Sequence, residues 1–149
     1  MKFEATLPVN ASPEAIWAII SDIENATNNI SAIEKIEVID LPSSGLVGLK
    51  WIETRTMFGK TATETMWITE SETNAYYQTR AENHGAIYIS RMFIQKKGDA
   101  NHIGMSFDGT PQTFGAKLMM FMMGWMFKKA TKKAIIKDLE DIKKAAEAI

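Results

Sequence analysis

The chain has 149 residues, a formal net charge of −1 and 46% hydrophobic residues, which is typical of a single globular domain. It contains no cysteine, which excludes disulfides, thiolate catalysis and cysteine-based metal sites. A near-neutral charge offers no basic field for a phosphate backbone, so we expect no nucleic-acid partner.

The first elements predicted along the chain are a strand and a short helix. Residues 2–9 alternate apolar and polar side chains, which predicts a half-buried strand. Ser12 is expected to cap the following helix, with Pro13 in its first position. The polar residues 22–29 interrupt the pattern and have room for a second short helix. Because no apolar leader follows Met1, we expect a cytoplasmic protein.

Strands then follow one another in quick succession. The predicted ranges are residues 33–41, 46–58, 61–72, 75–83, 86–96 and 102–108. Glycine, asparagine or proline marks most of the short connections between them. Short connections between consecutive strands indicate antiparallel hairpins.

The last third of the chain predicts one long helix. Residues 112–149 lack proline, and residues 114–127 are almost wholly apolar before a charged amphipathic half begins. The longest apolar run, residues 118–127, is too short for a membrane span of about 20 residues. A straight helix would measure about 55 Å and would place Lys128 and Lys132 on its own apolar face. Either the helix bends near Gly124, or these lysines lie at a cavity mouth and reach an acidic ligand.

Five methionines stand close together in the apolar half of this helix, and three roles remain open for them. Flexible thioether side chains suit irregular apolar surfaces. The segment could form the core and line a cavity, it could be a self-association surface in a homodimer, or it could touch a membrane surface peripherally. The methionines are Met119, Met120, Met122, Met123 and Met126.

Four segments together resemble a known family. They are Val9-Asn-Ala-Ser-Pro-Glu-Ala-Ile-Trp17, Leu46-Val-Gly48, Gly109-Thr-Pro111 and Asp138-Leu-Glu-Asp-Ile-Lys143. In this order the chain resembles the START-like, or SRPBCC, superfamily, which is also called the polyketide cyclase/dehydrase group. The resemblance implies one α+β domain over residues 1–149 with the helix-grip fold. In that fold six to seven antiparallel strands curve around the C-terminal helix, and two short helices lie between strands 1 and 2.

The resemblance also implies a ligand cavity between sheet and helix. We therefore expect binding of a hydrophobic small molecule, such as a lipid, quinone, isoprenoid or polyketide-like compound, without a cofactor. Two alternatives stay open: a cyclase- or dehydrase-type enzyme with an ionisable group in the cavity, and a chaperone-associated or stress-related interaction module. Binding without catalysis is favoured, because the sequence carries no serine-hydrolase, P-loop, dinucleotide or metal-ligand motif.

Candidate site residues come from charges that share a strand face with large apolar residues. Glu53 and Arg55 share a face with Trp51, and Arg91 is the strongest candidate to enter the groove because its same-face neighbours are the most apolar. The expected ligand-binding residues are Trp51, Arg55, Met66, Trp67, Tyr88, Arg91, Phe107, Phe121, Met122 and Trp125. The candidates for catalysis are Glu64, Arg91, Tyr77 and Tyr88. No metal ligands are expected.

Overall fold

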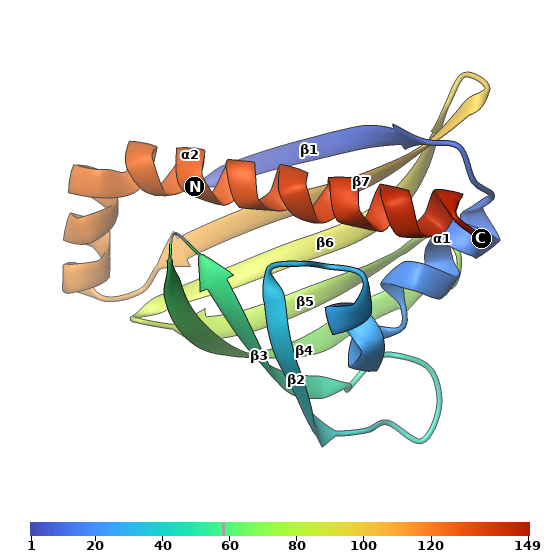
Figure 1. The fold of residues 1–149 in the computed structure, drawn as a ribbon. Coiled ribbons are helices and arrows are strands. Elements are labelled where there is room, and N and C mark those ends of the chain that lie inside the picture. Colours follow the sequence, from blue (N-terminus) through green and yellow to red (C-terminus); the bar gives the residue numbers. More distant parts are fainter. Residues whose placement is uncertain (58) are drawn as a thin grey trace.

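A single curved sheet of seven strands forms the body of the protein (Figure 1). The computed structural model describes residues 1–57 and 59–149, so Phe58, the last residue of one predicted strand, lies outside the described residues. The strands are β1 (Lys2–Val9), β2 (Ile33–Asp40), β3 (Lys50–Met57), β4 (Lys60–Glu72), β5 (Tyr76–Asn83), β6 (Ala86–Lys97) and β7 (Ala100–Pro111). Their order is β1-β7-β6-β5-β4-β3-β2, and all neighbours are antiparallel. The predicted α+β class and hairpin topology are confirmed.

Two short helices separate β1 from β2. They are α1 (Pro13–Ile20) and the 3-10 helix η1 (Ile23–Asn28). The Ser12 side chain accepts a hydrogen bond from the backbone N–H of Ala15 at 3.1 Å, so it satisfies one of the free donors of the first turn. Pro13 fills the first helical position, where its missing N–H costs nothing. Both predicted roles are confirmed.

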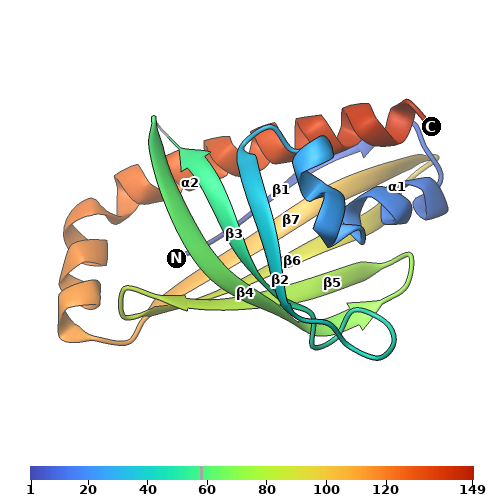
Figure 2. The same cartoon turned by 60° about the horizontal axis from the view of Figure 1, so that its bottom comes forward.

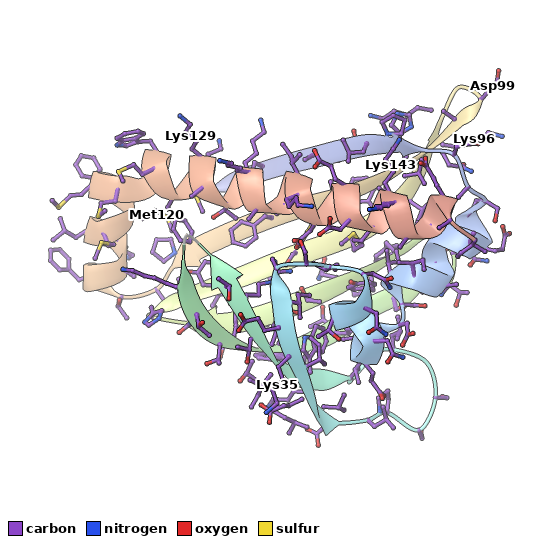
Figure 3. All side chains as sticks on the ribbon, viewed as in Figure 1. Lys35, Lys96, Asp99, Met120, Lys129 and Lys143 are labelled. Carbon is purple, nitrogen blue, oxygen red and sulfur yellow. The ribbon has the colours of Figure 1, made fainter. Side chains whose placement is uncertain are left out.

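The C-terminal helix α2 (Phe114–Glu147) bends sharply in its first third, close to Met120 (Figures 1 and 3). Beyond the bend it lies across the face of the sheet, where it packs on β1, β7 and α1 (Figure 2). A straight helix would have placed Lys128 and Lys132 on its apolar face. In the bent helix both lysines are exposed, and neither lines the cavity between the sheet and α2. Within the described chain, no helix is long and apolar enough to cross a membrane.

The start of α2 is fixed by the hairpin between β5 and β6. Gly85 has a φ of +73°, and its carbonyl accepts a hydrogen bond from the backbone N–H of Gln112 at 2.7 Å. A Cβ at this glycine would lie 2.5 Å from Oγ1 of Thr113, the residue that caps α2. Only glycine therefore allows the hairpin and the helix start to approach so closely.

The core lies beneath the carboxyl-terminal part of α2. Leu139 and Ile142 of this helix are almost fully buried against Ile16 of α1 and Ile103 of β7. A second apolar cluster, around Trp51 and residues of η1 and β4, fills the other side of the sheet's concave face. The helix is thus anchored along its carboxyl-terminal part, and the space between the two clusters is where a site can form.

Candidate functional site

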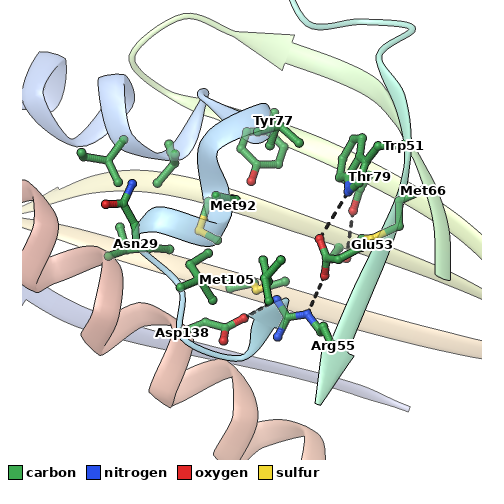
Figure 4. A pocket seen from close by; sticks show the side chains of 18 residues that line it. Asn29, Trp51, Glu53, Arg55, Met66, Tyr77, Thr79, Met92, Met105 and Asp138 are labelled. Carbon is green, nitrogen blue, oxygen red and sulfur yellow. Dashed lines mark hydrogen bonds and ion pairs between the residues drawn. The ribbon is translucent and has the colours of Figure 1, made fainter. Parts of the chain in front are cut away.

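A small cavity of about 70 Å³ lies between the sheet, the two short helices and α2 (Figure 4). Its lining joins residues from both core clusters, and most of it is apolar. The lining residues are Ile19, Ile20, Ile23, Ala26, Asn29, Ile30, Ile33, Trp51, Glu53, Arg55, Met66, Tyr77, Thr79, Ser90, Met92, Met105, Asp138 and Ile142. A void of this size holds a few water molecules and is smaller than the roughly 300–1,000 Å³ of drug-sized ligand sites.

One side of the cavity carries a buried cluster of three charged side chains. Arg55 donates from Nε to Glu53 at 2.5 Å and from Nη2 to Asp138 at 2.6 Å. The indole N–H of Trp51 donates to the other Glu53 oxygen at 3.3 Å. Glu53 and Arg55 face inward because they alternate with outward residues along β3, while Asp138 reaches the cluster from α2. The cluster therefore ties the helix to the sheet and places charge beside an apolar void.

The cluster contains two carboxylates for one cation. Burial raises the pKa of Asp138 above its ordinary value, because the loss of hydration outweighs the attraction of Arg55, and Glu53 adds repulsion. Burial alone would lower the pKa of Arg55, but Asp138 and Glu53 together hold it above its ordinary value. Arg55 therefore stays charged, whereas burial disfavours the ionised form of Asp138.

Asp138 also has an unused hydrogen-bonding atom. Its Oδ2 accepts from Arg55, whereas its Oδ1 is buried without a hydrogen-bond partner among the described residues. The whole residue is only 4% exposed. A buried acceptor without a partner is costly, so this oxygen is suited to accept a hydrogen bond from a molecule in the cavity.

Other polar groups line the same cavity. The hydroxyl of Tyr77 points into the cavity (Figure 4), and burial together with the charge of Glu53 raises its pKa. The hydroxyls of Thr79 and Ser90 are 3.0 Å apart and satisfy each other. The cavity is therefore an apolar chamber with one acidic wall and one phenolic hydroxyl.

The structure separates the ten expected ligand-binding residues into three groups. Trp51, Arg55 and Met66 line the cavity. Tyr88 and Phe107 share the concave face of the sheet but lie outside the cavity, where their rings are 5.6 Å apart. The others, Trp67, Arg91, Phe121, Met122 and Trp125, lie on other surfaces. Whether the first group binds a ligand stays a prediction.

The expectation that Arg91 enters the groove is wrong. Arg91 alternates with the cavity residues Ser90 and Met92, so it points away from α2. Its guanidinium lies over the ring of Tyr76 at 4.2 Å and donates to the side chain of Gln78. Its apolar neighbours along the strand belong to a half-buried outer face, which residue type alone does not distinguish from the inner one.

The same correction applies to Trp67 and to the expected residues of α2. Trp67 lies between the inward residues Met66 and Ile68, and the side chain of Lys50 covers its ring on the outer face. Phe121, Met122 and Trp125 are exposed, because the bend carries this part of α2 away from the sheet. None of these residues lines the cavity.

The four candidates for catalysis also lie in different parts of the structure. Tyr77 lines the cavity, whereas Arg91 is on the outer face. Glu64 lies directly opposite Glu53 in the pairing of β3 and β4, so burial and this like charge raise its pKa. Burial and Glu64 in turn raise the pKa of Tyr88. Glu64 and Tyr88 therefore lie outside the cavity on the concave face, and neither lines it.

Sequence reasoning did not select Asp138, the carboxylate that α2 contributes. A helical count contains the missing signal, since Ile135, Asp138 and Ile142 are spaced i, i+3 and i+7 and so share one face. Glu53 was placed on the same face as Trp51, but it was not selected as a site residue. In both cases an acidic residue among apolar residues on the same face indicates a polar group that faces the interior.

The whole chain matches a described protein family. The profile of the family named polyketide cyclase / dehydrase and lipid transport matches residues 1–147. The chain belongs to this family. The START-like resemblance drawn from the four segments is thereby confirmed. No protein of curated function matches the sequence.

Solved structures of the same fold cover nearly the whole protein. TTHA0849 from Thermus thermophilus is similar with a TM-score of 0.80 and 11% identity, over 99% of this chain and 98% of that one. The Zhui aromatase/cyclase from Streptomyces sp. R1128 has a TM-score of 0.81 and 13% identity, over 99% and 93%. Ginseng major latex-like protein 151 from Panax ginseng has a TM-score of 0.77 and 12% identity, over 96% and 95%. At these identities the likeness shows the fold alone.

Proposed function

We propose that this family member binds a small, largely apolar molecule that carries a hydrogen-bond donor, in the cavity between the sheet and α2. The single observation that carries the proposal is the buried Oδ1 atom of Asp138, which has no partner among the described residues and lines an otherwise mostly apolar chamber. The apolar lining supplies affinity through burial, at about 25 cal/mol per Å². The free acceptor selects the orientation of a hydroxyl or a similar donor.

Of the ligand classes expected from the sequence, a hydroxylated, polyketide-like aromatic compound fits this chemistry. Its ring matches the apolar lining, and its hydroxyl donates to Asp138. A ligand of several fused rings needs more room than the cavity now has. Three methionines in the lining, Met66, Met92 and Met105, have flexible side chains that can rearrange to provide it.

A matched pair of probes tests the proposal, since phenol and benzene differ only in the hydroxyl. In NMR titrations we expect phenol to bind about tenfold more tightly, because its hydroxyl satisfies a buried acceptor whose lack of a partner costs about 1–3 kcal/mol. Asp138→Leu removes the acceptor and should abolish this preference. Ala26→Phe places a ring in the cavity and should abolish binding of both probes, whereas Ala18→Phe, on the exposed side of α1, should not. Equal affinities in the wild type, or binding that survives Ala26→Phe, would contradict the proposal.

A second candidate function is proton transfer of the cyclase or dehydrase kind. The observation in its favour is that Asp138, whose pKa is raised by burial, and the Tyr77 hydroxyl line one chamber. In the simplest step the Asp138 carboxylate takes an α-proton from a ketone, which becomes an enolate; the carboxyl proton then exchanges with solvent, and the reverse step delivers a solvent-derived proton to the α-carbon. Cyclohexanone in D₂O tests this by NMR. Exchange at its α-carbon should exceed the buffer rate and fall to that rate in Asp138→Asn. Exchange at the buffer rate in the wild type would exclude this reaction for a ketone of this size.

A further inference from the structure

The amino-terminal part of α2 is an apolar helix with almost nothing packed against it. We call residues 114–127 the apolar segment. Its side chains include Phe114, Phe121 and Trp125, which are 82%, 88% and 71% exposed, and six further Leu, Met and Phe residues that are also exposed. Figure 3 shows these side chains projecting beyond the edge of the sheet. Exposed apolar surface of this extent marks an interaction site.

The apolar segment has no polar side to turn toward water. Residues 118–123 are six consecutive Leu, Met and Phe residues, and at 100° per residue they cover every side of the helix. A protein groove accepts one apolar stripe of a helix and leaves the opposite stripe in water. An apolar medium that surrounds the helix buries all of them. This all-round pattern therefore fits a lipid environment better than a groove on another protein.

A cluster of positive charge follows the apolar segment directly. We call Lys128, Lys129, Lys132 and Lys133 the lysine cluster, and all four are exposed. Residues 109–137 contain six lysines and no aspartate or glutamate, although the whole chain has a net charge of −1. Lysines beside an apolar surface attract anionic lipid headgroups. The same segment of a second copy of the chain would offer the lysine cluster no opposite charge, since residues 109–137 contain no aspartate or glutamate.

We propose that the apolar segment and the lysine cluster dock this protein on an anionic lipid bilayer. Measured along its axis the apolar segment is about 21 Å long at 1.5 Å per residue, and the bend near Met120 shortens its end-to-end reach further, so it is shorter than the roughly 30 Å hydrocarbon core. It therefore enters the headgroup and upper acyl region of one leaflet, and the lysine cluster contacts the anionic headgroups. The cavity and Asp138 take no part in this contact, so the proposal stands apart from the proposed ligand.

Vesicle sedimentation of the full chain tests the docking. The probes are vesicles of phosphatidylcholine alone and of phosphatidylcholine with phosphatidylglycerol. We expect the wild type to sediment with the anionic vesicles, to bind the neutral ones far less, and to release from the anionic ones in high salt. Fluorescence adds a second readout: the chain has four tryptophans, and the shift to shorter wavelength expected of the exposed Trp125 on binding should be missing in Phe121→Asp with Trp125→Asp.

Two double variants separate the contributions of apolar side chains and charge. Phe121→Asp with Trp125→Asp should abolish vesicle binding. Lys128→Ala with Lys129→Ala should lower the partition coefficient by at least about tenfold, since each lysine near an anionic surface contributes about fivefold. The matched control for charge is Lys96→Ala with Lys97→Ala, an adjacent exposed pair on β6. The matched control for apolar exposure is Leu41→Asp, at a site that is 69% exposed.

The two outcomes that would overturn the proposal are distinct. In one, the wild type fails to bind anionic vesicles, or both double variants bind as the wild type does. In the other, light scattering shows a wild-type dimer that Phe121→Asp with Trp125→Asp converts to a monomer, without any vesicle binding; the segment would then pair two copies of the chain. Because the substituted residues are exposed, circular dichroism should show all variants folded. The lysine variants and the salt dependence still decide the question if the aspartate variant does not fold.

Discussion

Arg55 and Asp138 stand 83 residues apart in the chain, yet their Nη2 and Oδ2 atoms lie 2.6 Å apart inside the protein. This ion pair connects β3, near one edge of the sheet, to the helix that packs on β1 and β7 at the other. Glu53 completes the cluster from the same strand as Arg55. The contact that holds the helix on the sheet is therefore also the polar wall of the cavity, so the same residues stabilise the fold and line the proposed ligand site.

Removing the cation of this cluster should destabilise the protein strongly. Arg55→Met keeps a similar volume but leaves two buried carboxylates without a positive partner. Loss of one member of a buried ion pair typically costs about 3–5 kcal/mol of the free energy of unfolding. We expect a loss of this size in urea unfolding at pH 7. Arg80→Met, which breaks an exposed pair with Glu82, should cost less than about 1 kcal/mol. Similar losses in both variants would show that the Arg55 cluster is solvated.

The raised pKa of Asp138 predicts a pH dependence of stability. The native state holds this proton more tightly than the unfolded chain, whose aspartates have a pKa of about 3.8. The resulting stabilisation is complete below that pH and is lost as the pH rises through the raised native value. Glu64, whose pKa is also raised by burial, acts in the same direction. As the pH rises above about 3.8, the wild type should therefore lose more stability than Asp138→Asn does.

Urea unfolding at a series of pH values measures this difference. The matched control is Glu140→Gln, which removes an exposed carboxylate from the same helix. If Asp138→Asn keeps the wild-type pH profile, the attraction of Arg55 would balance the burial of Asp138. The carboxyl group would then not be poised for the proton transfer considered above.

The parts of this structure that follow from local sequence were predictable. Ser12 and Pro13 fix the start of α1 through groups within one turn, so the cap could be inferred from three neighbouring residues. The hairpins follow from alternation and turn residues in the same way. Arg91 was misplaced because a strand has two faces, and only the pairing with distant strands decides which one is inside. Asp138 was missed because its partner, Arg55, comes from the other half of the chain.

The exposure of the apolar segment could not be predicted from the sequence either. Residues 114–127 have the composition of a core helix, and composition alone predicts burial. Their position is set by the bend near Met120 and by the hairpin glycine, Gly85, that holds Thr113 at the helix start. Both are features of the tertiary structure, so core, dimer contact and membrane contact could not be separated before the fold was known.

A glycine on β7 should be sensitive to a single added methyl group. Gly104 lies directly opposite Phe93 of β6, and a Cβ there would come within 2.3 Å of the phenyl ring. Gly104→Ala should therefore cost about 1–3 kcal/mol of the free energy of unfolding, as overpacking usually does. In a Phe93→Ala background the same change should cost much less. A double-mutant cycle measures this coupling, and additive effects would mean that the ring moves aside freely.

One substitution made at two positions of α2 tests which part of the helix belongs to the core. Leu139 is fully buried, whereas Leu118 in the apolar segment is 49% exposed. Leu139→Ala should lower the free energy of unfolding by about 2–5 kcal/mol, because it leaves a cavity between α2 and the sheet. Leu118→Ala should change it by no more than about 0.5 kcal/mol. Urea unfolding of both variants measures the contrast. A large loss for Leu118→Ala at low protein concentration would mean that the apolar segment packs on its own domain and is not free to meet a lipid surface.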